Sequence, residues 1–247
     1  MHMRSLFITG TDTNVGKTWI TCSLLKLFAD RKVAAGGYKP VCSGAEFHPD
    51  GTPHWADVDA LRTHSPLNPP EELVCPQRFL APLAPNLAAE LENSSVNEPL
   101  LAAGAAAWRS LTSLLLIEGA GGLYCPLSNN LTVLDLILQL QTPAIVVAAN
   151  RLGCISHSRM TTELLARHNI PVLGLVLNNV RPADTADDDQ SLRHNAAQLR
   201  HWLPQIPILT SSHNARSLQL FSPGSLPLAN LENWLSFAAQ THSPGQF

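Results

Sequence analysis

The sequence has little basic charge and very little lysine. Its 16 Lys and Arg residues stand against 19 Asp and Glu, which gives a formal net charge of −3 at pH 7. A protein that binds nucleic acid generally carries a basic face, so we expect no nucleic-acid partner. Because lysine is scarce, a lysine inside a motif is a stronger functional candidate. The chain's lysines are Lys17, Lys26, Lys32 and Lys39.

The sequence also lacks paired cysteines and any long uninterrupted hydrophobic run. No two of its 5 cysteines form a Cys-x-x-Cys pair, and such a dispersed, odd set is typical of free thiols in a reducing compartment. The most apolar later stretch, 131–149, is broken by polar residues and a proline, so no membrane span is expected. The N-terminus has no hydrophobic region of signal-peptide length. We therefore predict a cytoplasmic protein without a membrane partner.

Apolar runs alternate with helical segments along most of the chain. The runs at 6–8, 36–41, 111–117, 143–149 and 171–176 read as strands, and a shorter one follows at 204–209. Segments with helical rhythm lie at 19–31, 86–92, 98–109, 131–140, 156–168 and 190–202. This alternation predicts an α/β fold with a single doubly wound, mainly parallel sheet and helices on both faces. We expect one domain over residues 1–216 and a tail, 217–247, that packs on it or is partly ordered.

Residues 10–18 read Gly-Thr-Asp-Thr-Asn-Val-Gly-Lys-Thr and lie between the first apolar run and the first helical segment. A glycine-bearing loop between a strand and a helix collects backbone N–H groups that bind phosphate. Gly16 allows a close backbone approach, Lys17 can reach the terminal phosphates, and the Thr18 hydroxyl can bind Mg²⁺. Five residues separate the two glycines, where the usual P-loop has four. The stretch predicts a nucleoside triphosphate site.

Polar residues at strand ends extend this site, because parallel strands bring their carboxyl ends to one edge of the sheet. Lys39 precedes a proline, which favours an extended conformation and places it at the end of a strand. Glu118 follows a buried strand and opens a glycine-rich turn, where P-loop enzymes place a carboxylate that faces the metal. Asp57 or Asp59 could reach the same metal, or both could cap the next helix.

Two later segments suggest contacts with other parts of a ligand. The helix expected to begin near Ser156 presents free N–H groups that could hold an anion such as a carboxylate. Asn178 and Asn179 follow a buried strand, and their amides could hydrogen-bond the edge of a base.

Taken together, these blocks resemble the dethiobiotin synthetase family. The resemblance is carried by the loop 10–18, Tyr-Lys-Pro-Val-Cys-Ser-Gly at 38–44, Val-Asp-Ala at 58–60, Glu-Gly-Ala-Gly-Gly at 118–122, Leu-Gly-Cys-Ile-Ser-His at 152–157, and Asn178–Asn179. It implies a P-loop NTPase fold and an ATP- and Mg²⁺-dependent reaction that joins 7,8-diaminononanoate and CO2 into dethiobiotin. It also implies a homodimer with the substrate site at the subunit interface.

The resemblance further implies a role for each matching residue. Lys17 and Lys39 would be catalytic, and Thr18, Asp59 (rather than Asp57) and Glu118 would hold the metal. Thr13 and Ser43 would contact the substrate, while Gly153, Cys154 and Ile155 would hold its carboxylate from the neighbouring subunit. The implied ATP-binding residues are Asn14, Val15, Gly16, Lys17, Thr18, Trp19, Asp59, Glu118, Gly119, Ala120, Gly121, Asn178, Asn179, Pro207, Ile208 and Leu209.

The chain departs from the family pattern at Asn14, Arg151, Ser156 and Asn214, where glutamate, lysine, asparagine and glutamate are usual. Two other functions share parts of the pattern. A related P-loop biosynthetic ligase could act on another amine or carboxylate, but the amidotransferase-linked kind needs a nucleophilic cysteine in a glutaminase region, which none of the cysteines provides. An ATP-dependent dimer switch typically carries a second lysine early in the loop, where this chain has Thr-Asp-Thr-Asn.

Overall fold

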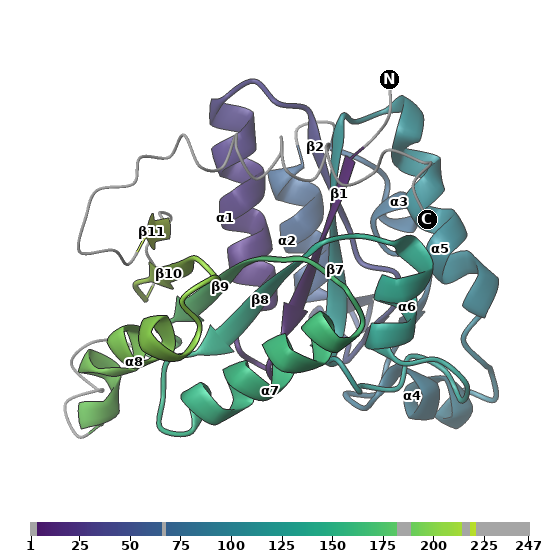
Figure 1. Cartoon of the computed structure of the whole chain (residues 1–247). Helices are drawn as coiled ribbons and strands as arrows, with labels where there is room; N and C mark the ends of the chain where they lie inside the picture. Colours follow the sequence, from purple (N-terminus) through teal and green to yellow (C-terminus); the bar gives the residue numbers. More distant parts are fainter. Residues whose placement is uncertain (1–3, 66–67, 182–188, 214–217, 221–247) are drawn as a thin grey trace.

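A seven-stranded sheet forms the centre of the protein. The computed structural model describes residues 4–65, 68–181, 189–213 and 218–220. The strands of the sheet are β1 (Arg4–Gly10), β2 (Ala35–Tyr38), β7 (Leu114–Gly122), β8 (Ala144–Ala149), β9 (Val172–Asn178), β10 (Ile208–Ser211) and β11 (Leu218–Leu220). They lie in the order β11-β10-β9-β8-β1-β7-β2, and β11 alone is antiparallel to its neighbour (Figure 1).

The strands at the middle of the sheet are almost continuously apolar, because helices cover both of their faces. All six residues of β8 are buried, as are Leu6, Phe7 and Ile8 of β1. The predicted doubly wound, mainly parallel α/β fold is therefore confirmed.

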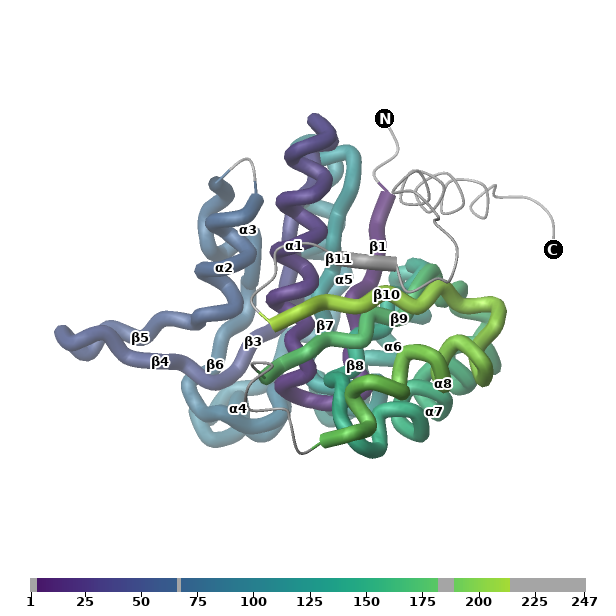
Figure 2. The backbone as a smooth tube through the Cα atoms, turned by 90° about the vertical axis from the view of Figure 1, so that its left-hand side faces the viewer, coloured from purple at the N-terminus to yellow at the C-terminus, as the bar shows by residue number. Residues whose placement is uncertain are grey.

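The main helices divide between the two faces of the sheet. Helices α1 and α2 lie on one face, and α6, α7 and α8 lie on the other (Figure 2). Helix α5 packs beside α6, and Tyr38 of β2 fills the space next to its Gly104. The helices are α1 (Lys17–Asp30), α2 (Ala56–His64), α3 (Glu71–Val74), α4 (Pro85–Leu91), α5 (Glu98–Ala106), α6 (Val133–Leu140), α7 (Cys154–Arg167) and α8 (Asn195–Trp202), with 3-10 turns at Ala107–Ser110 and Gln190–Arg193.

The segment between β2 and α2 differs from the loop that its turn-forming residues predict. It contains a hairpin of β4 (Glu46–Phe47) and β5 (Pro53–His54), and β3 (Cys42–Ser43) pairs with β6 (Arg78–Phe79). The hairpin projects from the body of the protein (Figure 2). Two-residue strands have no recognisable sequence period, so composition alone reads such a segment as a loop.

The glycine-rich stretch after Glu118 also differs from the predicted turn. Strand β7 continues through it to Gly122, which pairs with Gly10 across an irregular register. Glycine is needed on the P-loop side of this pairing, because a Cβ atom on Gly10 would lie 2.8 Å from the carbonyl oxygen of Asp12 and 3.2 Å from that of Gly121. The strand and the P-loop are therefore pressed together at the edge of the sheet where the site lies.

The predicted division between the domain and its tail, at residue 216, stays a prediction. Strand β11 belongs to the segment 217–247 and pairs with β10, so the sheet extends into that tail. The rest of the predicted tail, from residue 221, lies outside the described residues. None of the described helices is long and apolar enough to cross a membrane.

Candidate functional site

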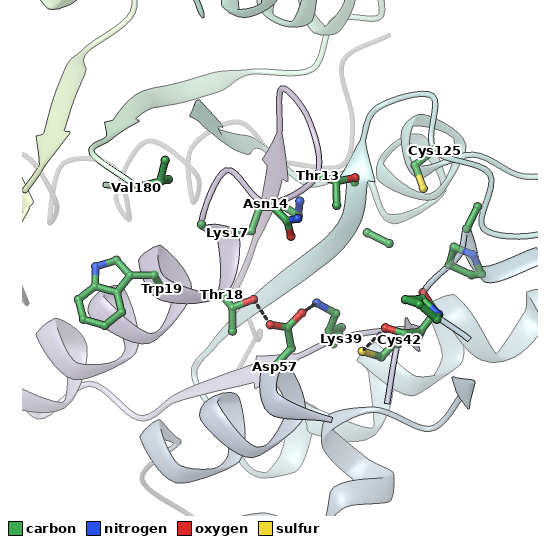
Figure 3. Close-up of a pocket in the computed structure, with 18 of the residues that line it drawn as sticks. Thr13, Asn14, Lys17, Thr18, Trp19, Lys39, Cys42, Asp57, Cys125 and Val180 are labelled. Atoms are coloured by element: carbon green, nitrogen blue, oxygen red, sulfur yellow. Dashed lines mark hydrogen bonds and ion pairs between the residues drawn. The ribbon is translucent and has the colours of Figure 1, made fainter. Parts of the chain in front are cut away.

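A cavity of about 930 Å3 opens at the carboxyl edge of the sheet. Figure 3 shows Lys39, Cys42 and Asp57 on one side of it and Trp19 and Val180 on another. We call the part around Lys17, Thr18, Lys39, Asp57 and Glu118 the charged end. The part lined by Asn178, Asn179, Val180 and His213 is the amide end.

The P-loop turns into α1 at Gly16, which has a left-handed φ of 89°. A side chain at this position would also collide with Asn178, since a Cβ atom would lie 2.1 Å from its Nδ2. The loop's lysine folds back on the loop itself, where Lys17 Nζ donates to the carbonyl oxygen of Asp12 at 3.1 Å. Only glycine tolerates both the left-handed φ and the close approach of the Asn178 side chain at position 16, so Gly16 fixes the path of the loop.

The charged end contains a hydrogen-bonded network of two carboxylates, two hydroxyls and the ammonium group of Lys39. Thr18 Oγ1 lies 2.8 Å from Asp57 Oδ1 and 2.7 Å from Glu118 Oε1. Lys39 Nζ donates to Glu118 Oε1 at 2.8 Å and also to Asp57 Oδ2. The second oxygen of Glu118 accepts from Thr21 Oγ1 at 2.8 Å. Every oxygen of the buried Glu118 carboxylate is therefore partnered.

Burial and ion pairing compete in this network. Burial lowers the pKa of Lys39, but Glu118 and Asp57 outweigh it and raise that pKa well above its usual value. Burial also opposes ionisation of Asp57, yet Lys39 and Thr18 hold the pKa of this carboxyl below its ordinary value. Burial lowers the pKa of Lys17, which Glu118 only partly counteracts. Asp57 and Lys39 are therefore a fully ionised pair at neutral pH.

The donor set of the charged end fits Mg²⁺. Among the residues that the structure describes, no group of three or more His, Cys, Asp and Glu side chains could hold a metal ion. Thr18, Asp57 and Glu118 instead gather one hydroxyl and two carboxylates at the start of α1. Mg²⁺ prefers oxygen ligands and is commonly bound by one or two carboxylates together with substrate phosphates.

Comparisons with known proteins agree with this arrangement. A family described as AAA domain matches residues 4–216. The "ATP-dependent dethiobiotin synthetase BioD" of Anaeromyxobacter sp. (strain K) is 40% identical over 206 residues, covering 83% of this chain and 88% of that protein. The "ATP-dependent dethiobiotin synthetase BioD 1" of Escherichia coli (strain K12) is 36% identical over 176 residues, covering 71% and 78%. The chain belongs to the dethiobiotin synthetase family.

Among solved structures, chloroplast FtsY from Physcomitrella patens is similar with a TM-score of 0.49 at 15% identity, over 90% of this chain and 63% of that one.

Family membership confirms the resemblance, but one predicted ligand lies elsewhere. The carboxylate that reaches the charged end is that of Asp57, whereas the prediction named Asp59. Asp59 Oδ2 lies 3.1 Å from His54 Nδ1, on the side of α2 that faces the β4–β5 hairpin. Residues two apart on a helix point about 200° away from each other, so only one of the two aspartates can face the P-loop. These contacts favour Asp57 over Asp59 as the aspartate that faces the metal, and the metal role of either residue stays a prediction.

Most of the other predicted site residues lie together. Residues that line the cavity are Thr13, Asn14, Gly16, Lys17, Thr18, Trp19, Lys39, Ser43, Ala120, Gly121, Asn178 and Asn179. The predicted site residues that do not line it are Val15, Glu118 and Gly119; Asp59; Pro207, Ile208 and Leu209; and Gly153, Cys154 and Ile155. Glu118 lies behind the wall and reaches it through Thr18 and Lys39. Residues 207–209 enter β10 at the amino-terminal side of the strand, where the carbonyl of Pro207 accepts from the N–H of Leu175. Gly153–Ile155 form the start of α7.

The structure adds cavity residues that the motifs did not indicate. Val180 and His213 extend the amide end, and the segment 82–85 covers the charged end. Their signal in the sequence is weak, because 82–85 comes from a proline-rich excursion and His213 follows the last parallel strand. Cys42 and Cys125 also line the cavity, and burial raises the pKa of both thiols, that of Cys42 to about 11. These cysteines are therefore weak nucleophiles.

A second cavity of about 610 Å3 lies on the other side of the P-loop and shares Thr13, Gly121 and Cys125 with the first. The side chains of Tyr124 and Met160, 68% and 59% exposed, belong to its wall. An opening lined by exposed apolar side chains and joined to the first cavity through Thr13 offers room for a second, partly apolar ligand.

Proposed function

We propose that the chain catalyses the ATP- and Mg²⁺-dependent carboxylation and cyclisation of 7,8-diaminononanoate with CO2 to dethiobiotin. The observation that carries the proposal is the placement of Lys39. Its ammonium bridges Asp57 and Glu118 beside the P-loop threonine, at the end of a cavity whose other end displays amides. The names of the relatives support the same activity.

ATP would bind with its phosphates on the P-loop N–H groups at the start of α1 and its base at the amide end. Asn178 and Asn179 line that end, and their carboxamides can hydrogen-bond the edge of adenine. Thr18, Asp57 and Glu118 would hold the Mg²⁺ ion, which neutralises charge on the phosphate oxygens when it is bound. Pro207, Ile208 and Leu209 lie outside the described cavity wall, so they would support the base site from behind rather than contact the base.

The reaction would proceed in three steps. One amine of the substrate attacks CO2 and loses a proton, which leaves a carbamate. A carbamate oxygen then attacks the γ-phosphorus of ATP and displaces ADP, forming a carbamic-phosphoric anhydride. The second amine attacks the carbamate carbon and expels phosphate, which closes the cyclic urea and releases another proton.

Lys39 and Lys17 would flank the oxygens that gain charge in the second step. Phosphoryl transfer depends mostly on positioning and on charge stabilisation. The side chain of Lys39 is 5% exposed, and its ion pairs with described residues are those with Asp57 and Glu118. It would exchange part of that pairing for the anionic carbamate and γ-phosphate oxygens. Lys17 Nζ, which donates to the carbonyl of Asp12, would likewise exchange that hydrogen bond for the phosphate oxygens, which it reaches from the P-loop.

The diamine would bind in the region that joins the two cavities. Thr13 lines both, and Ser43 lines the first beside Lys39. The carboxylate of the substrate would lie on the N–H groups at Gly153, Cys154 and Ile155 of a neighbouring subunit. Leu152, 81% exposed beside that helix start, and Met160 on the same helix give the surface an apolar character that suits a homodimer.

The test is to incubate the protein with MgATP and bicarbonate, with and without 7,8-diaminononanoate, and to measure phosphate release together with dethiobiotin by mass. We expect release that depends on the diamine and equals the dethiobiotin formed. Nucleotide binding without such release would overturn the proposed substrate. Release that depends on another amine would indicate a ligase of changed specificity, with Arg151 and Ser156 as the first residues to exchange.

A further inference from the structure

Three asparagines form a hydrogen-bonded chain behind the amide end of the cavity. Asn195 begins α8, Asn150 follows β8, and Asn179 follows β9. Asn195 Nδ2 donates to Asn150 Oδ1 at 2.9 Å, and Asn150 Nδ2 donates to Asn179 Oδ1 at 2.8 Å. Asn195 and Asn150 are 3% and 9% exposed, whereas Asn179 lines the cavity. The chain therefore runs from the protein interior to the cavity wall.

Main-chain carbonyls fix the direction of this chain. Asn195 Nδ2 also donates to the carbonyl of Arg151 at 3.2 Å, and Asn150 Nδ2 donates to that of Leu192, also at 3.2 Å. A carbonyl oxygen only accepts hydrogen bonds, so turning either carboxamide over would set two oxygens against each other. Asn179 thus receives its hydrogen bond on Oδ1 and keeps Nδ2 as its free hydrogen-bonding group among the described residues.

The neighbouring Asn178 is anchored with the opposite polarity. Its Nδ2 donates to the carbonyl of Val15 at 3.0 Å, in the P-loop, which leaves Oδ1 as the oxygen available to a ligand. The backbone links the two systems again, because the N–H of Asn150 donates to the carbonyl of Asn178 at 2.7 Å. The amide end therefore presents one acceptor and one donor from adjacent residues.

This pair of groups matches adenine and opposes hypoxanthine or guanine. Adenine carries an exocyclic amino donor next to a ring-nitrogen acceptor, whereas O6 of guanine or hypoxanthine is an acceptor. The N1–H of those bases is a donor and would face the donor of Asn179. Leaving polar groups mismatched in a partly buried site is costly, so the orientation of the two carboxamides can determine which base binds.

We propose that Asn150 and Asn195 are positioning residues that set the donor polarity of Asn179 and thereby the preference of this site for adenine. This inference rests on the proposed function, because it takes the base of the nucleotide to lie at the amide end. Neither residue touches the nucleotide. Each acts through the orientation of Asn179.

The decisive variant is Asn150→Asp, which reverses the polarity without changing the shape. A carboxylate at 150 still accepts from Asn195 but has no hydrogen to give, so Asn179 turns its Nδ2 inward and presents Oδ1 to the cavity. We expect the ratio of kcat/KM for ATP to that for inosine triphosphate to fall at least tenfold. The matched control is Asn97→Asp, an equal change at the N-cap of α5, where aspartate caps as well as asparagine. Its ratio should stay within twofold of the wild type.

Ring-nitrogen analogues test the contact itself. With the wild-type protein, 1-deaza-ATP should bind about tenfold more weakly than ATP, because N1 of adenine would face Nδ2 of Asn179. 7-deaza-ATP is the control, because N7 is an acceptor in adenine, guanine and hypoxanthine alike and does not distinguish them. Both Asn150→Asp and Asn179→Ala should reduce the penalty for 1-deaza-ATP to less than twofold. Asn195→Ala, which leaves the Leu192 anchor on Asn150 in place, should lower the ATP preference by only about threefold.

Several results would overturn the inference while leaving the proposed function intact. If the wild type makes dethiobiotin from ATP but binds 1-deaza-ATP as tightly as ATP, Asn179 does not contact N1 of the base. If Asn150→Asp folds and keeps the wild-type ratio, the polarity is not relayed. If Asn150→Asp fails to fold, as judged by circular dichroism, Asn195→Ala provides the test. An unchanged ratio of kcat/KM for ATP to that for inosine triphosphate in this variant would show that Asn195 does not set the orientation of Asn179. Absence of ATP binding by the wild type would overturn the proposed function itself.

Discussion

At the charged end of the cavity, the ionised Lys39, Asp57 and Glu118 partner one another, whereas at the amide end neutral side chains are held by main-chain carbonyls. Lys39, Asp57 and Glu118 can each take another partner of the right charge, because none is fixed by the backbone. Asn178 and Asn150 have no such freedom, since Val15 and Leu192 admit only a donor. The difference suits the two tasks proposed for the site, exchange of counter-charges during phosphoryl transfer and constant readout of a base.

Removing the ammonium of the charged end should have the largest effect. Lys39→Ala is expected to lower kcat by roughly 10²-fold, about 3 kcal/mol of transition-state stabilisation, as for loss of one preorganised charge partner. The KM for ATP should change little, because the amide end is untouched. Lys26→Ala, on the exposed face of α1, is the control and should leave steady-state rates unchanged. Near-normal turnover of Lys39→Ala would remove this residue from the catalytic set.

The assignment of Asp57 over Asp59 can be sharpened with a matched pair of variants. Asp57→Asn should raise the Mg²⁺ concentration for half-maximal rate by about tenfold, or ~1.4 kcal/mol for one weakened ligand. Asp59→Asn removes the same charge from the same helix but faces His54, and its Mg²⁺ titration should match the wild type. A shift in Asp59→Asn and none in Asp57→Asn would reverse the assignment. Titrations of initial rate at saturating ATP decide between them.

The smallest expected effect is on stability at acid pH. The pKa of Asp57 lies below its ordinary value of 3.8, so the unfolded chain binds its proton first as the pH falls. The contribution of the Asp57 carboxylate to the free energy of unfolding is complete at pH values above its ordinary pKa. It is lost as the pH falls through the lowered pKa of the folded protein. Because the side chain is 44% exposed, we expect about 1 kcal/mol or less.

Urea unfolding of the wild type and Asp57→Asn between pH 6 and pH 3 measures this effect. The difference in the free energy of unfolding between the two proteins should be constant near pH 6 and shrink towards pH 3. A difference that grows with acidity would contradict the lowered pKa. The amide end has no ionisable group in its asparagine chain, so Asn195→Ala should show the same loss at both ends of the range.

The two ends also differ in how far the sequence predicts them. The P-loop, Lys39 and Glu118 were found because local signals mark them: a glycine-rich turn, a residue before proline and an acid after an apolar run. Strand and helix positions follow from similar local patterns, which is why the sheet was predicted and the two-residue strands were not. The choice between Asp57 and Asp59 depends on the rotational phase of α2, which Val58 and Leu61 fix by packing inward.

The asparagine chain has no comparable local signal. Asn150 and Asn195 are 45 residues apart, and a lone asparagine after a strand or at a helix start is ordinary. Their relation arises only when the sheet order places β8 beside β9 and packs α8 against α7. The roles of Gly153, Cys154 and Ile155 depend on a neighbouring subunit and stay predictions.

Strand β11 has a consequence for where this chain can be shortened. The family match ends at residue 216, two residues before β11 begins. A protein cut at that limit would leave one side of β10 with unpaired N–H and C=O groups, a row that other chains can add to. Self-association through the exposed edge of β10 would then be mistaken for the proposed homodimer contact, so expression boundaries should retain Leu218–Leu220.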